Sequence, residues 1–449
     1  MTDPETTETE TTNTHAGDRD CFVFLPGMGS NASVDQSVLG LSGQLARVLS
    51  LNAKDKTATF YAKVEAAKEA GDIGEEIGTV YRTDAEGTRA ILDLYRCDYR
   101  EDLVERFAKR NLFVRTVYLL AALPVSIIRV FRAFFTGQSS KTRSETIQLF
   151  YALGILSLLV LYVGILFVAL WTTGGQLLHV ISPSATAWIA SIQPKFAAEY
   201  PSYFATAAQA VVVISAAIAF FLPSGVTLKD LIGKAAVNYL CLINYLNLGD
   251  GRSTVYGKLE RLIDNIELKS GIAKRDGKSA YRSINILAYS FGSIVALDCL
   301  FPIDQQPSAP LRSVSTLITI GCPFDFIRSL WRDYFDNRRR FSLGTPTRWL
   351  NVYSLEDVLG SNFRNDSTSG DANINVQGTS QQQDPDIPIP SVNVHYTQGL
   401  NYSKLSWFSS LTLLGLRSHS MYWGAGPGPD SNCFNTLVPR IFEGDPALD

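Results

Sequence analysis

Residues 283–293 read SINILAYSFGS, and the apolar run IVALDCLF follows at 294–301. The first seven residues form a short apolar run, which is typical of a buried strand, and the second run predicts a helix. Ser290 is therefore expected in a sharp strand-to-helix turn. Such a turn lifts a serine hydroxyl above the sheet edge, needs small residues two positions to either side, and directs the next backbone N–H groups at one point. The sequence thus predicts a nucleophilic serine at the start of a helix.

Ala288, Ser290 and Gly292 carry this pattern, which resembles the nucleophile elbow G-x-S-x-G of the α/β-hydrolase superfamily. One position departs from it, because Ala288 stands where the superfamily has its first glycine. The resemblance covers residues 21–110 and 236–449. It implies an α/β fold, with a mainly parallel sheet and helices on both faces, and a lipase- or esterase-like serine hydrolase. The alternative interpretation is an ordinary turn whose serine has no chemical role.

Apolar patterning elsewhere agrees with alternating strands and helices. Strands are predicted for CFVFL at 21–25, TRAILDLYRCDY at 88–99, VSTLITIG at 314–321 and WLNVYS at 349–354. Helical spacing of apolar residues predicts helices at 34–50, 228–247 and 255–268. This order of elements favours a mostly parallel sheet.

A serine needs a nearby base to accept its proton, and the chain has only four histidines. His15 lies in an acidic N-terminal tail and His179 between two apolar runs, so neither is expected near Ser290. His395 belongs to the strand-like VNVHY, whereas His419 follows it in the small, polar segment RSHSMYW. In the superfamily's chain order the histidine comes last, on a loop. His419 is therefore the predicted general base, and a structural histidine is the alternative.

The carboxylate that orients the base is expected between serine and histidine in the chain, at the end of a strand. Asp357 comes just after the predicted strand WLNVYS and is the predicted residue. Its neighbour Glu356 is an alternative, and Asp325 in ITIGCPFDF is a weaker one because it follows an earlier strand. Solvated loop charges are the competing interpretation of all three acids.

The segment Leu25-Pro26-Gly27-Met28-Gly29 follows the first predicted strand. It partly resembles the superfamily's His-Gly-x-Gly loop, with Pro26 in place of the histidine. This resemblance implies that the backbone amides of Met28 and Phe291 form an oxyanion hole. A plain Pro-Gly turn is the alternative. The predicted reaction needs neither a metal nor an organic cofactor.

Hydrophobic residues make up 46% of the chain and charged residues 18%, and residues 147–194 contain no Asp, Glu, Lys or Arg. Within this region, residues 147–171 are long enough to cross a hydrocarbon core of about 30 Å, and residues 203–222 predict a return span. Residues 111–135 are apolar but interrupted by Arg115, Pro124, Arg129 and Arg132, which favours an interfacial helix over a third crossing. A buried helix of a soluble domain is the alternative.

These features predict an integral membrane protein in which an insertion at 111–235 divides a hydrolase domain into residues 21–110 and 236–449. Positive charges flank the two predicted spans, at Arg129, Arg132, Lys141, Arg143, Lys229 and Lys234. This distribution predicts that the catalytic part faces the cytoplasm. An acidic tail at 1–20 is predicted to be disordered, and a low-complexity stretch at 365–386 predicts a mobile loop. Six scattered cysteines favour reduced thiols.

A net charge of −3 offers no general attraction to nucleic acid. A hydrolase held at a bilayer is predicted to bind lipid and to act on membrane lipid esters such as phospholipids, lysophospholipids or acylglycerols. Two other functions remain open. One is a deacylase or thioesterase of lipid-modified proteins, and the other is a non-catalytic hydrolase-like membrane scaffold.

Overall fold

The computed structural model describes residues 19–29, 36–65, 76–135, 146–157, 159–160, 237–249, 251–272, 281–303, 306–335, 348–354, 356–361, 371–375, 388–396, 418–423 and 432–442. The chain divides into two compact units. The first comprises residues Met1–Leu103, Gln138–Gln148 and Asp250–Asp449, and the second Val104–Gly137 and Leu149–Gly249. The predicted tail at 1–20 lies outside the described residues up to position 18, and Arg19 and Asp20 already belong to the first strand.

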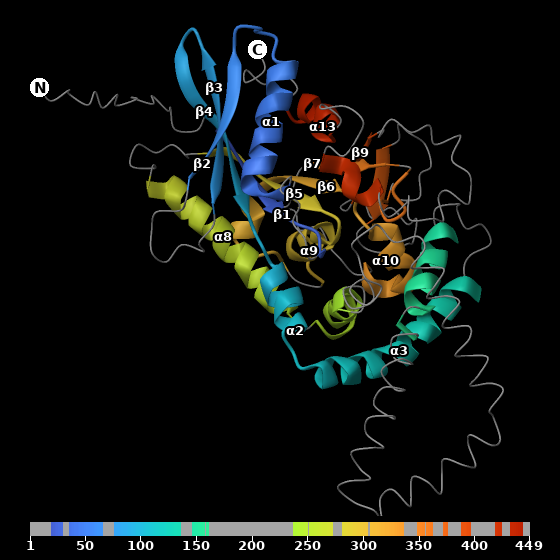
Figure 1. The fold of residues 1–449 in the computed structure, drawn as a ribbon. Helices are drawn as coiled ribbons and strands as arrows, with labels where there is room; N and C mark the ends of the chain where they lie inside the picture. The colour runs from blue at the N-terminus through green and yellow to red at the C-terminus, as the bar shows by residue number, and fades with distance from the viewer. Residues whose placement is uncertain are drawn as a thin grey trace, which may run out of the picture. The chain divides into compact units, whose positions relative to one another are not determined.

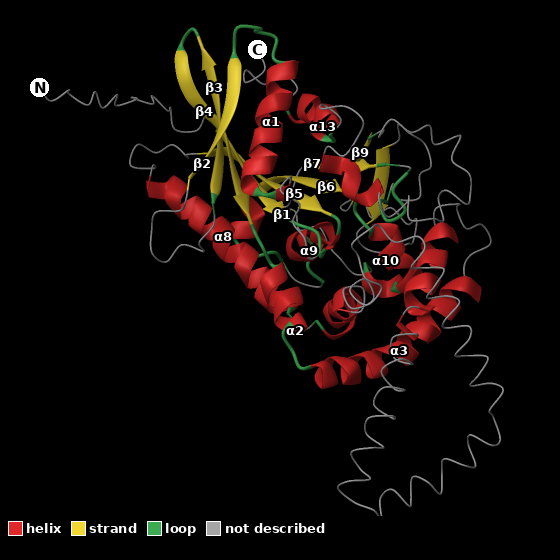
Figure 2. Ribbon diagram, viewed as in Figure 1, coloured by secondary structure: helices red, strands yellow, loops and turns green. Residues whose placement is uncertain are grey.

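The first unit is built on a nine-stranded sheet with the order β2-β3-β4-β1-β5-β6-β7-β9-β8. The central strands β4, β1, β5, β6, β7 and β9 run parallel to one another. At one edge β2 and β3 add antiparallel pairs, and at the other edge β8 pairs antiparallel with β9. The unit therefore has an α/β fold with a mixed, mostly parallel sheet, as Figures 1 and 2 show.

Five of the six parallel strands coincide with apolar runs of the sequence, and the sixth, β9, contains most of the strand-like segment VNVHY. Their bounds are β1 Arg19–Leu25, β4 Gly87–Arg96, β5 Tyr281–Tyr289, β6 Val314–Ile320, β7 Arg348–Tyr353 and β9 Pro388–His395. Strands of this kind are buried on both faces, which is why they read as nearly continuous hydrophobic runs.

Three further strands were not predicted from the sequence: β2 Thr59–Glu65, β3 Ile77–Asp84 and β8 Asp371–Asn375. β8 lies inside the stretch 365–386 that was expected to be a loop, so this expectation is wrong for residues 371–375. Its partner is β9. Pairing with the edge of β9 provides the backbone hydrogen bonds that hold this polar segment as a strand.

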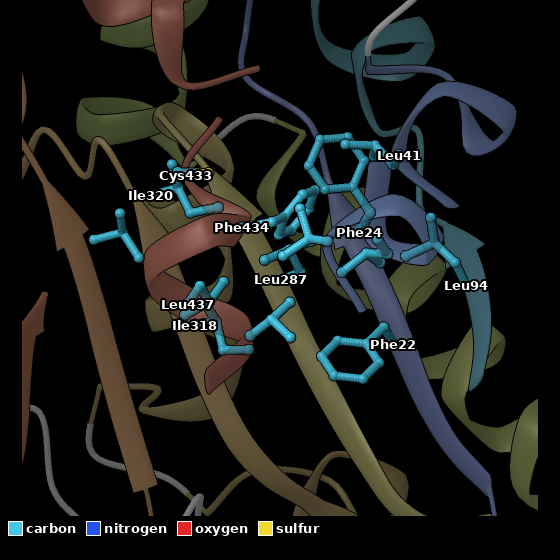
Figure 3. Packing of buried hydrophobic residues seen from close by; sticks show 14 of the residues in the cluster. Phe22, Phe24, Leu41, Leu94, Leu287, Ile318, Ile320, Cys433, Phe434 and Leu437 are labelled. Carbon is cyan, nitrogen blue, oxygen red and sulfur yellow. The ribbon is translucent and has the colours of Figure 1, made fainter. Parts of the chain in front are cut away.

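Helices cover both faces of this sheet. α1 (Val38–Asn52) and α13 (Phe434–Ile441) pack against one face, and α9 (Phe291–Leu300) packs against β1, β5 and β6 with α8 (Arg252–Ile272) beside it (Figures 1 and 2). In Figure 3, Phe434 and Leu437 of α13 meet Leu287 and Ile318 of the sheet. This core joins α13 to the central strands.

Helices make up the described part of the second unit. A π-helical turn at Glu101–Glu105, which begins in the first unit, runs into the short α2 (Arg106–Ala108), and the long α3 spans Leu112–Phe135. An apolar helix occupies Thr146–Ser157, and a helix at 237–243 continues into a π-helical turn at Asn244–Leu248.

Only part of the predicted membrane region is described. The described residues contain one helix that is long and apolar enough to cross a membrane, Val117–Phe135 of α3, and helices in the cores of soluble proteins can meet the same criteria. Of the predicted span 147–171, residues 147–157 and 159–160 are helical and the rest lies outside the described residues. The predicted return span 203–222 lies wholly outside them.

Candidate active site

Ser290 occupies a strained turn between β5 and α9. Its φ of 53° and ψ of −126° make it the one non-glycine residue with positive φ among the described residues. Its amide donates to the Ile320 carbonyl at 2.8 Å, and its own carbonyl accepts from the Ser293 amide at 2.9 Å. Non-glycine residues persist in such conformations only where the surroundings fix them, and they concentrate at functional sites. The strand-to-helix turn expected from the sequence is present.

Small residues give this turn its steric room. A Cβ added to Gly292 would lie 2.5 Å from the Leu25 carbonyl oxygen and 2.6 Å from that of Pro26. The helix start and the loop after β1 therefore approach more closely than any side chain at position 292 allows. Ala288, which replaces the first glycine of the superfamily pattern, is fully buried between β1 and β6, so its methyl group fits the sheet.

His419 connects Ser290 to Asp357 through both ring nitrogens. Nε2 lies 2.7 Å from Ser290 Oγ, and Nδ1 lies 2.8 Å from Asp357 Oδ2. When Nδ1–H donates to the carboxylate, Nε2 is left with the lone pair that accepts the serine hydroxyl proton. The three residues, separated by up to 129 positions in the chain, thus form one hydrogen-bonded series.

The buried Asp357 carboxylate accepts two further hydrogen bonds. The Leu359 amide donates to Oδ1 at 2.9 Å, and the Tyr422 hydroxyl donates to Oδ2 at 2.9 Å. The same hydroxyl accepts from the Ser354 amide at 3.0 Å. Burial raises the pKa of Tyr422 well above its ordinary value, and the charge of Asp357 adds to this effect, so the hydroxyl keeps its proton and remains a donor.

Tyr289 contacts both the backbone and the ring of His419. Its hydroxyl donates to the His419 carbonyl at 2.5 Å, and its ring stacks on the imidazole with centroids 5.3 Å apart. Burial is also the main cause that raises the pKa of Tyr289, and the charge of Asp357 contributes. One face and the backbone of His419 are therefore held by the residue that precedes Ser290 in the chain.

Gly321 lies directly after β6, and its lack of a side chain leaves room for the side chains of Asp357, His419 and Tyr422. It has a φ of +56°, and an added Cβ would lie 2.9 Å from Tyr422, 3.1 Å from Asp357 Oδ2 and 3.2 Å from His419. Sequence patterns assigned no role to Gly321, Tyr289 or Tyr422. The available signal was adjacency, since Tyr289 precedes the serine and Tyr422 follows the histidine by three positions, but neither forms a recognised pattern.

The loop after β1 lies beside Ser290. A Cβ on Gly27 would be 3.1 Å from the Cβ of Ser290, and Tyr99 donates to the Pro26 carbonyl at 2.7 Å. Met28 is buried, and Phe291 is the first residue of α9. The two segments named as sources of oxyanion-hole amides are therefore adjacent in space.

Two of the three alternative site residues lie in other elements, α10 and β9. Asp325 pairs with Arg328 at 2.7 Å, within α10 (Phe324–Leu330). His395 ends β9, with its ring 5.3 Å from the ring of Tyr353, and burial lowers its pKa. Glu356 is buried next to Asp357, but the carboxylate that contacts His419 is that of Asp357.

No group of three or more His, Cys, Asp or Glu residues that could hold a metal occurs in the described ranges. Comparison of the chain with protein-family models, with curated proteins and with solved structures found no match. Chemically, a serine hydroxyl hydrogen-bonded to an imidazole that is itself oriented by a buried carboxylate can act as a nucleophile toward an acyl carbonyl.

Proposed function

We propose that this protein is a serine hydrolase of the α/β-hydrolase type that cleaves acyl esters. The observation that carries the proposal is the contact of 2.7 Å between Ser290 Oγ and His419 Nε2, made by a serine held at positive φ between a strand and a helix. In this proposal Ser290 is the nucleophile, His419 the general base, and Asp357 the residue that orients the imidazole.

The reaction has two halves. Ser290 Oγ attacks the acyl carbonyl while its proton moves to His419 Nε2, and a tetrahedral oxyanion forms. The intermediate collapses as His419 gives that proton to the leaving alcohol, which leaves an acyl-serine. Water, deprotonated by His419, then attacks the acyl-serine, and the acid is released with Ser290 restored.

The proposed oxyanion donors are the backbone amides of Met28 and Phe291. The close approach of Gly292 to the Leu25 and Pro26 carbonyls supports this assignment, because it holds the loop after β1 against the start of α9. Amides fixed before the reaction stabilise the developing charge without reorganising, and the N-terminus of α9 adds a favourable partial charge.

The proposed substrates are membrane lipid esters. The apolar segment 111–235 interrupts the proposed hydrolase domain between β4 and α8. Because this segment would hold the active site at a bilayer surface, we assign membrane lipids as the substrates. We further propose that residues 147–171 and 203–222 cross the bilayer and that the hydrolase part lies on the cytoplasmic side.

Labelling with a fluorophosphonate probe tests the proposed chemistry, because such a probe reacts with an activated serine. The wild-type protein should be labelled and Ser290→Ala should not, while His419→Ala should react far more slowly. Ser50→Ala is the matched control, since Ser50 is exposed on α1, and it should react like the wild type. Undiminished labelling of Ser290→Ala would exclude the nucleophile, and no labelling of the folded wild type would favour a non-catalytic scaffold.

A further inference from the structure

The helix α3 has an unusual distribution of exposed and buried side chains. Eight large hydrophobic residues on one side of the helix are exposed: Val114, Val117, Tyr118, Leu120, Val125, Ile128, Phe131 and Phe135. The exposed fraction reaches 66% at Ile128 and 80% at Phe135. A surface helix of a globular protein normally turns polar side chains outward. An apolar exposed stripe of this length marks an interaction surface.

The opposite side of α3 packs within its own unit and includes polar groups. Leu119, Ser126, Val130 and Ala133 are buried there. Ser126 is hydrogen-bonded to Tyr239, and Arg129 donates to the Asn247 side chain at 2.6 Å. Ser126 and Arg129 thus bond to residues of their own unit, while the exposed side of α3 is apolar apart from Arg132.

The segment from Val104 to Phe135, which includes α3, is strongly basic, and this charge favours an anionic partner. From Val104 to Phe135 there are six basic residues and one acidic residue, Glu105. The basic residues are Arg106, Lys109, Arg110, Arg115, Arg129 and Arg132. Basic residues close to an anionic membrane surface are attracted to its headgroups. An apolar face on a basic helix fits a bilayer with anionic headgroups better than it fits another apolar protein surface.

The spacing of the arginines indicates how the helix lies. The uncharged run between Arg115 and Arg129 covers residues 116–128. At 1.5 Å per residue this run is about 20 Å long, shorter than a hydrocarbon core of about 30 Å. A crossing helix would bring Arg129 and Arg132 into the core, whereas a helix along the surface keeps both at the headgroups.

We infer that α3 docks along the surface of an anionic bilayer, with its exposed apolar face in the acyl-chain boundary and without crossing. This interaction goes beyond the proposed hydrolase activity, because a chemically inactive protein with the same surface would also bind.

Single-cysteine labelling of the full-length protein in liposomes tests this orientation. The six native cysteines are all buried, so an introduced exposed cysteine can be labelled selectively with an environment-sensitive fluorophore. The variants are Val117→Cys, Val125→Cys and Phe135→Cys on the exposed face. The matched control is Leu51→Cys, at an exposed apolar position on α1 in the other unit. The liposomes contain phosphatidylcholine with phosphatidylglycerol, or phosphatidylcholine alone.

In the mixed liposomes, all three α3 labels should be quenched to the same extent by a quencher attached near the lipid headgroup, and the Leu51 label only by aqueous iodide. Lipid quenching of the α3 labels should be severalfold weaker in phosphatidylcholine alone. Iodide quenching of the α3 labels equal to the control would overturn lipid docking. Deep quenching that peaks at position 125 would overturn the surface orientation. Fluorophosphonate labelling of the same variants reports on Ser290 separately, so failure of either proposal is recognisable.

Discussion

Tyr422 links two residues that follow β7. Its hydroxyl donates to Asp357 Oδ2 and accepts from the Ser354 amide, and the side chain is fully buried. A hydrogen bond to a charged group contributes about 1.5–3 kcal/mol. Through Asp357, this hydroxyl fixes the orientation of the imidazole that contacts Ser290.

Tyr422→Phe is therefore expected to lower kcat for ester hydrolysis by roughly tenfold to a hundredfold, with KM nearly unchanged. Steady-state kinetics with a soluble ester measures both values. Tyr81→Phe, which removes a half-buried hydroxyl on β3, is the control and should leave kcat unchanged. An effect on KM alone would show that Tyr422 serves substrate binding and does not position Asp357.

Gly292 allows the start of α9 to approach the loop after β1, because it has no side chain. In Gly292→Ala the new Cβ would meet two backbone carbonyls at 2.5 and 2.6 Å, and the backbone can respond only by moving apart. We expect loss of fluorophosphonate labelling and a lower melting temperature, since overpacking typically costs about 1–3 kcal/mol.

Gly257→Ala provides the comparison for this substitution. Gly257 lies within α8, and nothing is within 4 Å of an added Cβ. The substitution should be neutral or stabilising by up to about 1 kcal/mol, because alanine favours a helix over glycine. Labelling of Gly292→Ala at the wild-type rate would contradict the close approach at position 292.

At the scale of elements, α13 anchors the segment that carries His419. The Cys433 amide, just before the helix, donates to the Tyr422 carbonyl at 2.9 Å. Phe434 packs edge-on against Trp423 with centroids 5.7 Å apart, and Leu437 is fully buried against the sheet (Figure 3). The last helix therefore joins the histidine segment to the central core.

Leu437→Ala should lower the free energy of unfolding by about 2–5 kcal/mol, because it leaves a cavity between α13 and the sheet. Thermal unfolding followed by circular dichroism measures the change. Leu51→Ala, at an exposed position of α1, should shift the melting temperature little. Equal shifts for the two variants would mean that α13 does not contribute the packing described.

At the scale of the whole molecule, buried tyrosines and cysteines affect the response to alkaline pH. Burial raises the pKa of Tyr95, Tyr281 and Tyr422, and it also raises the pKa of the Cys322 thiol. These groups all belong to the first unit. Each keeps its proton in the folded state at a pH where the unfolded chain loses it.

Stability is therefore expected to be constant with respect to these groups below their ordinary pKa values of about 8.5 for cysteine and about 10 for tyrosine. It should fall as the pH rises through that range, because the unfolded state then binds fewer protons than the folded state. Denaturant midpoints across this range, with tyrosinate absorbance in parallel, test the expectation. Gradual appearance of tyrosinate in the folded protein, with no change in midpoint, would contradict it.

Local patterns predicted the central strands, α1, α9 and the turn at Ser290, because burial on both faces and small flanking residues leave strong signals in the chain. The resemblance to the α/β-hydrolase superfamily selected Asp357 and His419, because it implies the chain order serine, carboxylate, histidine. The structure brings these two residues into hydrogen-bond contact with each other and His419 into contact with Ser290. Their catalytic roles remain predictions. β2, β3 and β8 were not predicted, since their pairing depends on neighbouring strands more than on their own residues.

The sequence by itself determined where a buried strand gives way to a helix and which serine lies at that junction, since these properties depend on residues a few positions apart. Only the tertiary structure decided that Tyr289, Gly321 and Tyr422 surround the same imidazole, and which side of α3 is left exposed. The physical reason is that both results depend on contacts between distant segments. A side chain's own residue type does not specify what will pack against it.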